Sequence, residues 1–146
     1  MASITSANAV YLLSINALYN TAQHLQGFAA DEIFSTDPLE SAEVMMGVDG
    51  ILSAGFIFVP VKQMIALQAD SASNAIFENW WSSQQQIKDL YFANGQITLP
   101  SIGRKFTLTQ GVLSTYPPVA DAKKVLQPRK YGITWQSIIP AILTTQ

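Results

Sequence analysis

The chain contains no cysteine, which excludes disulfide cross-links and metal sites built on thiolates. Its one histidine, His24, is too few for the zinc sites that combine three or four His and Cys ligands. Charged residues are also scarce, at 12% of 146 residues, whereas 49% are hydrophobic. This composition indicates either an unusually complete core or an exterior that is partly covered by partners.

Long apolar runs are missing as well. No run reaches the roughly 18 residues that a transmembrane helix needs, and the N-terminal residues lack the positive charges of a secretory signal. The net charge of −2 argues against nucleic-acid binding driven by phosphate neutralisation. We therefore expect one soluble domain, residues 1–146, made in a bacterial cytoplasm.

Basic residues are absent from the first 61 positions, which hold six acidic residues, whereas the remainder holds all eight basic residues and only four acidic ones. If the two sets reach opposite surfaces, the acidic face of one copy can meet the basic face of the next in a head-to-tail contact. The alternative is a chance distribution in a fold that mixes both halves on every face. The charges that matter for such a contact are Asp31, Glu32, Asp37, Glu40, Glu43, Lys123, Lys124, Arg129 and Lys130.

Short strands separated by turns dominate the pattern. We expect strands at 10–15, 18–26, 42–48, 51–59, 61–68, 87–93, 96–99, 105–116 and 129–139, the last ended by Pro140. Asp49-Gly50 predicts a type I′ hairpin turn, and Asn94-Gly95 predicts a second hairpin. The stretch 27–43 reads as a loop or long excursion. Alternation in the last strand places Tyr131, Ile133 and Trp135 on one face.

One amphipathic helix is expected over residues 72–86, which contain neither glycine nor proline. Asp70 and Ser71 are candidate N-caps. The apolar stripe comprises Ala72, Ala75, Ile76, Phe77 and Trp80. The fold class is therefore mainly β, a small β-barrel or β-sandwich with one helix and antiparallel hairpins.

No catalytic or cofactor motif is present in the sequence. No serine lies in a G-x-S-x-G turn, and Gly103-Arg104-Lys105 lacks the rest of a phosphate-binding loop. The acidic stretch 31–43 lacks the ligand spacing of a calcium loop. We expect no enzyme activity, no metal and no cofactor. A ligand-binding barrel remains an alternative, with Trp80, Trp81, Tyr91 and Phe92 lining a cavity.

The order of these elements resembles the tail tube proteins of contractile-tailed bacteriophages. The resemblance spans 42–135 and rests on the Gly47-Val48-Asp49-Gly50 hairpin, the strand ending in Leu67-Gln68-Ala69-Asp70-Ser71, the single helix, the 94–95 hairpin, the strand 103–110, and Leu126-Gln127-Pro128 before a Trp-containing strand. The tube protein of type VI secretion systems is similar in fold.

This resemblance implies a structural virion protein that forms hexameric rings stacked head to tail into a hollow tube. Strands of all subunits then join in one inner barrel, and DNA passes its lumen without specific binding. The polar faces of 18–26 and 129–136 are the candidate lumen lining. The acidic stretch 31–43 is expected to contact the basic residues 123, 124, 129 and 130 of a neighbouring subunit or ring. The resemblance implies tail sheath, baseplate and terminator proteins as partners and the virion tail as the location. A secretion-system tube is a further alternative.

Overall fold

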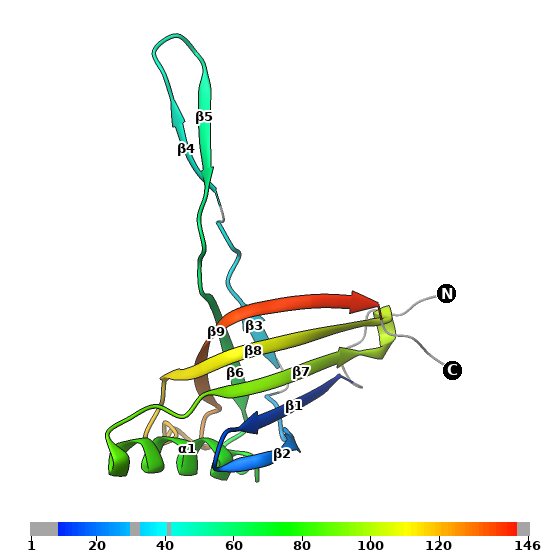
Figure 1. Ribbon diagram of the computed structural model, residues 1–146. Coiled ribbons are helices and arrows are strands. Elements are labelled where there is room, and N and C mark those ends of the chain that lie inside the picture. The colour runs from blue at the N-terminus through cyan, green and yellow to red at the C-terminus, as the bar shows by residue number, and fades with distance from the viewer. Residues whose placement is uncertain (1–8, 30–32, 41, 143–146) are drawn as a thin grey trace.

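Figure 1 shows the fold in a computed structural model, which describes residues 9–29, 33–40 and 42–142. An antiparallel sheet in the order β2-β1-β7-β8-β9-β6-β3 forms the body. The helix lies at one end of it, and the separate hairpin β4-β5 projects from the other. The elements are β1 (Val10–Ile15), β2 (Tyr19–His24), β3 (Phe34–Thr36), β4 (Ala42–Met46), β5 (Leu52–Phe56), β6 (Val61–Leu67), α1 (Asn74–Ile87), β7 (Ala93–Leu99), a 3₁₀ turn η1 (Pro100–Ile102), β8 (Arg104–Thr115) and β9 (Arg129–Ile142).

The core lies between one face of this sheet and α1. Tyr131, Ile133 and Trp135 on β9 are fully buried, as their predicted alternation requires. From α1, Phe77 stacks on Tyr131 with ring centroids 4.2 Å apart, and Trp80 is completely enclosed. The helix therefore closes the apolar face that the sheet alone leaves open.

A buried glutamine on β6 links this strand to three others inside the core. Gln63 Oε1 on β6 accepts hydrogen bonds from the Tyr11 hydroxyl (2.5 Å) and from Trp135 Nε1 (3.2 Å). Its amide nitrogen donates to Thr36 Oγ1 at 3.3 Å. Each polar group thus has a partner, which removes the cost of burying it unpaired.

The helix is confirmed, with different details at its N-terminus. It begins at Asn74 with Ser73 as N-cap, so the prediction of Asp70 or Ser71 as the cap was wrong. Ser71 instead donates to the Gln26 carbonyl, and Ser73 Oγ accepts from Gln26 N at 2.8 Å. The two hydroxyls therefore bind the chain after β2 rather than the first turn of α1. Of the predicted stripe, Ile76, Phe77 and Trp80 are buried, whereas Ala72 and Ala75 are exposed.

The hairpin at Asp49-Gly50 is confirmed, but its turn is not type I′. Gly47 N donates to the Ile51 carbonyl and Gly50 N to the Gly47 carbonyl, which closes a three-residue loop. Gly50 alone has a positive φ, +84°, whereas type I′ requires it at Asp49 too. The Asp49 carboxylate accepts from Ile51 N at 3.1 Å, which fixes the longer loop.

The predicted hairpin at Asn94-Gly95 was wrong, because both residues lie inside β7 and residue 87 ends the helix. A β-bulge falls at this point of the β7-β8 pair. A Cβ on Gly95 would lie 3.0 Å from the Leu12 carbonyl oxygen, so glycine allows this close approach of β1. Asn94 Oδ1 accepts from Gln110 N at the kink in β8.

The last strand continues past Pro140 to Ile142, contrary to prediction. Pro140 pairs with Phe106 of β8, while β6 accompanies β9 only as far as Trp135. Beyond Trp135 one side of β9 therefore has no partner strand in the described part of the chain, and prolines within sheets are found at such edges. The mainly β class with one helix is confirmed. Within the described residues the sheet ends at β2 and β3 and does not close into a barrel.

Candidate functional site

A long arm, defined as residues 37–60, leaves the sheet between β3 and β6 and carries β4 and β5 at its tip (Figure 1). Every described residue of β4 and β5 is exposed, so neither face of this two-stranded sheet is covered. Half of the exposed large apolar side chains of the described chain lie on this arm: Leu39, Val44, Met45, Met46, Val48, Ile51, Leu52, Phe56, Ile57 and Phe58. An isolated hairpin of this kind is marginally stable in water, and its apolar surface marks an interaction site.

The arm was foreseen only as a loop and a hairpin. The signal in the sequence is the lack of regular alternation, because Val44–Met46 and Phe56–Val59 are runs of consecutive apolar residues. That pattern is typical of a strand covered on both faces. Here both faces are bare in the single chain.

Three of the five predicted acidic contacts can be located. Asp37, Glu40 and Glu43 lie on the arm, and all three are exposed. Asp49, which was not among the predicted contacts, lies exposed at the tip of the arm. Asp31 and Glu32 lie outside the described residues. The arm therefore combines apolar side chains with negative charge and contains no basic residue.

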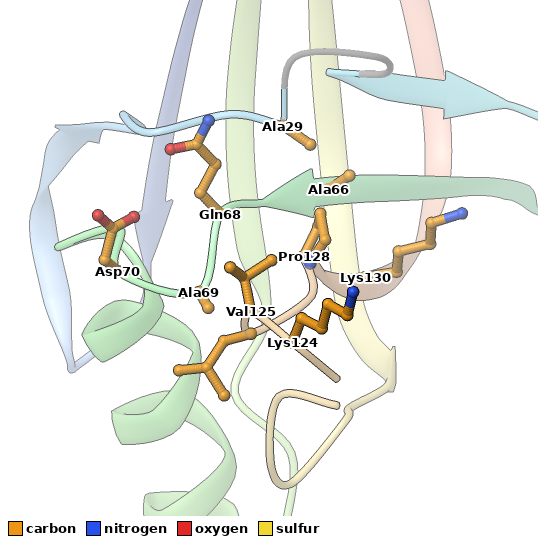
Figure 2. A pocket seen from close by; sticks show the side chains of 10 residues that line it. Ala29, Ala66, Gln68, Ala69, Asp70, Lys124, Val125, Pro128 and Lys130 are labelled. Atoms are coloured by element: carbon orange, nitrogen blue, oxygen red, sulfur yellow. The ribbon is translucent and has the colours of Figure 1, made fainter. Parts of the chain in front are cut away.

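A pocket of about 840 Å³ lies at the opposite end of β6 from the arm (Figure 2). Small side chains form much of its lining, including the buried Ala29 and Ala66 and the neighbouring Ala69. Val125 and Leu126 are exposed at 71% and 60%. Lys124 and Lys130 line it from one side and Asp70 from another. The result is an apolar depression with two lysines and one carboxylate.

The predicted basic cluster is divided by the structure. Lys123, Lys124 and Lys130 are exposed, but Arg129 is 7% exposed. Its Nη2 donates to the Pro117 carbonyl at 2.8 Å, and its guanidinium lies over the rings of Tyr116 and Tyr131. Glu78 is 3.9 Å away. Arg129 therefore holds the 117–128 loop to the body instead of offering its charge to a partner.

Two buried tyrosines are the groups whose titration the fold changes most. Burial raises the pKa of Tyr11 well above its ordinary value. Burial also raises the pKa of Tyr131, and the nearby Arg129 opposes this rise without cancelling it. Both hydroxyls are donors in structural hydrogen bonds, to Gln63 and to Asn74. They serve stability and do not mark a reactive centre.

The sheet face turned away from the core carries polar side chains on its central strands, together with Leu12 beside Gln96 and Ile139 beside Thr107. A Cβ on Gly95 would point to Leu108 and Trp135 in the core, so Asn94 and Gln96 face outward. The register places Ser14 opposite Asn94 and Thr107 opposite Gln96. None of the seven strands of this sheet contains an acidic residue.

The four aromatic residues expected to line one cavity are divided: Phe92 lines a pocket together with Trp135, whereas Trp80 is enclosed in the core. Trp80 is fully buried and donates from Nε1 to the Tyr91 carbonyl, while Trp81 stacks on Tyr116. His24 is exposed at the edge strand β2. Among the described residues, no three acidic or histidine side chains gather as a metal site, and no helix has the length and hydropathy to cross a membrane.

Chains with this fold occur in solved structures. The chain matches one from the anti-feeding prophage (AFP) baseplate with a TM-score of 0.60 at 11% identity, covering 99% of both chains. It matches a chain from the AFP tube-terminating cap with a TM-score of 0.60 at 8% identity, covering 97% of this chain and 93% of that one. A chain of the PVC sheath-tube complex, an extracellular contractile injection system in its extended state, gives 0.52 at 10%, covering 90% and 88%. At these identities the likeness shows the fold.

No curated protein matches the sequence. The family model described as tail fiber protein gp32, however, matches residues 2–139, almost the entire chain. The resemblance to proteins of contractile tails is thereby confirmed. The chain belongs to the tail fiber protein gp32 family.

Proposed function

We propose that this protein is a structural subunit of a contractile phage-like tail, which assembles into six-membered rings stacked head to tail as a hollow tube. The observation that carries the proposal is the arm, whose two bare apolar faces need a neighbouring chain. Burying apolar surface contributes about 25 cal/mol per Å². The arm therefore supplies a driving force for association that a monomer leaves unused.

The two open edges of the sheet support a ring. β2 and β3 each have one side without a strand partner among the described residues. Exposed edges pair readily with other strands, and a closed barrel removes them. Edge pairing between adjacent subunits would continue the sheet around the ring. The polar outward face, with Asn94, Gln96 and Thr107, would then suit a lumen through which DNA slides without sticking.

The family description names a tail fiber, and the three related folds come from a baseplate, a cap and a sheath-tube complex. The candidate assemblies for this chain are therefore a fiber, a terminal ring and a repeating tube. We favour the tube because the arm and the pocket lie at opposite ends of the body, a layout that lets identical copies stack without limit. A secretion-system tube has the same geometry and differs only in its cargo.

Negative-stain electron microscopy of the purified protein, with sedimentation velocity over a range of concentrations, tests the proposal. Hollow rings or tubes with a central hole are expected, with a particle mass that rises with concentration. Solid fibers would contradict the tube, and a monomer at every concentration, including in the presence of preformed tail particles as nuclei, would contradict assembly as such.

A further inference from the structure

We infer that the pocket lined by Ala29, Ala66, Lys124 and Val125 receives the arm tip of a second copy of this chain. This inference rests on the proposed function and specifies which surfaces meet in the stack. It identifies the occupant of the pocket as the loop Gly47–Ile51 with its flanking apolar residues.

The arm and the pocket lie at opposite ends of β6. The arm connects Thr36, the last residue of β3, with Val61, the first residue of β6. The pocket lies at the other end of β6, around Ala66 and Asp70. A contact between them joins different surfaces of identical copies, so it is heterologous and propagates along one direction.

Size and polarity also match. At the tip, Val48 is fully exposed and Ile51 is 64% exposed, so two branched apolar side chains project from one short loop. The pocket of about 840 Å³ has alanines at its floor, which leave room for such side chains. Val125 and Leu126 supply exposed apolar rims. Both partners bury surface that is bare in the single chain.

Charge complementarity sets the polarity of the contact. The arm carries Asp49 at its tip and Glu43 on β4, with no basic residue. Lys124 lines the pocket, and the exposed Lys123 precedes it, against the single carboxylate of Asp70. The acidic arm tip of one copy and the lysines at the pocket of the next attract each other. Two acidic arms repel each other, which disfavours a symmetric arm-to-arm dimer.

Engineered cysteines test the contact cleanly, because the chain has none of its own. Copies with Val48→Cys are mixed with copies with Val125→Cys under assembly conditions and oxidised with diamide. A disulfide needs Cβ atoms about 3.8 Å apart, so it reports a specific contact. We expect mixed dimers in at least about tenfold excess over those from Val48→Cys with the exposed control Ser82→Cys on α1. The double variant in one chain should give a ladder.

Ile51→Cys with Leu126→Cys repeats the test on neighbouring positions, so a distorted single site does not decide the result. Rings or tubes that form without either cross-link, or with Val48→Cys linked to itself, would overturn the inference and leave the proposed function standing. Copies that sediment as monomers under all conditions would overturn both. The readout of assembly and the readout of contact are therefore separate.

Discussion

Arg129 is the one charged side chain that the fold buries among the described residues. Its guanidinium donates to the carbonyls of Pro117 and Pro118, at 2.8 and 3.5 Å, and lies over two aromatic rings. The sequence predicts Arg129 as a charged contact for a neighbouring subunit, because its burial depends on carbonyls twelve and eleven positions away in the chain. The loop that it anchors carries Lys124 and Val125, so Arg129 also shapes the pocket.

Arg129→Met is expected to lower the free energy of unfolding by about 2 kcal/mol, because hydrogen bonds to a buried charge contribute about 1.5–3 kcal/mol. Urea denaturation of the monomer measures this change. Lys123→Met, at an exposed neighbouring position, should change it by no more than about 0.5 kcal/mol. Equal effects of the two substitutions would show that the guanidinium contacts do not matter.

Gly111→Ala tests the packing of the core. A Cβ at this position would lie 2.5 Å from the Trp135 ring and 2.9 Å from Ile133, so the ring has to move. We expect a loss of about 1–3 kcal/mol in the free energy of unfolding. Gly55→Ala on the arm meets nothing within 4 Å and is the matched control. A neutral Gly111→Ala variant would contradict the tight packing against Trp135.

The pH dependence of stability should come from the buried tyrosines at alkaline pH. Burial raises the pKa of Tyr11 above its ordinary value of 10.0, so the unfolded chain loses this proton first. The contribution of the protonated Tyr11 hydroxyl to the free energy of unfolding is complete below about pH 10. Above that pH it decreases by up to about 1.4 kcal/mol per pH unit. Denaturation at about pH 9 and about pH 11 should show this decrease, and Tyr11→Phe should make it shallower. An unchanged slope in that variant would exclude Tyr11 as the source.

At the scale of elements, local signals predicted those elements whose contacts are local. The helix and the Asp49-Gly50 hairpin are such cases, since each closes over a few residues. Asn94-Gly95 carries an equally strong turn signal and lies inside a strand, because Gly95 is needed where β1 approaches closely. Pro140 is tolerated because β6 has already ended. These outcomes depend on neighbours far away in the sequence.

The arm shows the same limit for the candidate site. The sequence indicates two apolar strands joined by a turn, but not that they project away from the sheet. Their exposure follows from the strand pairing: β3 and β6 belong to the seven-stranded sheet, whereas β4 and β5 pair only with each other in a separate two-stranded sheet. Arm and pocket become recognisable as opposite ends of one body only in three dimensions.

Phe58→Gln is expected to abolish or weaken assembly without affecting the fold. Phe58 is 93% exposed, so its loss should change the free energy of unfolding by no more than about 0.5 kcal/mol. Sedimentation velocity at concentrations where the unmodified protein assembles measures the effect. Leu90→Gln, half exposed near the end of α1, is the control and should assemble normally. Normal assembly of both variants would show that the Phe58 side chain is not in an interface.

For the whole molecule, the clearest charge feature is the acidic arm. Four of the eight described acidic residues, Asp37, Glu40, Glu43 and Asp49, lie on it, and it holds no basic residue. The pocket end carries both signs, with exposed Lys123, Lys124 and Lys130 beside Asp70 and Asp121. Attraction between the acidic arm of one copy and these lysines of the next would favour head-to-tail order over random association.

Reversal of two charges, Lys123→Glu with Lys124→Glu, should weaken assembly most at low ionic strength. At about 1 M salt the Debye length falls to about 3 Å, so the difference from the unmodified protein should shrink. Light scattering as a function of salt concentration records it. Reversal of Arg104 and Lys105, at the far end of β8, is the control for net charge. Unchanged assembly at both salt concentrations would refute the contact of Lys123 and Lys124 with the acidic arm.

The most direct measurement is a cryo-electron microscopy reconstruction of the assembled particle at a resolution that traces the strands. It should show six-membered hollow rings stacked in one direction, with the polar sheet face toward the lumen and every arm covered by a neighbouring chain. A solid fiber, or rings in which the arms project uncovered into solvent, would contradict the proposal that this apolar arm drives the formation of a tail tube.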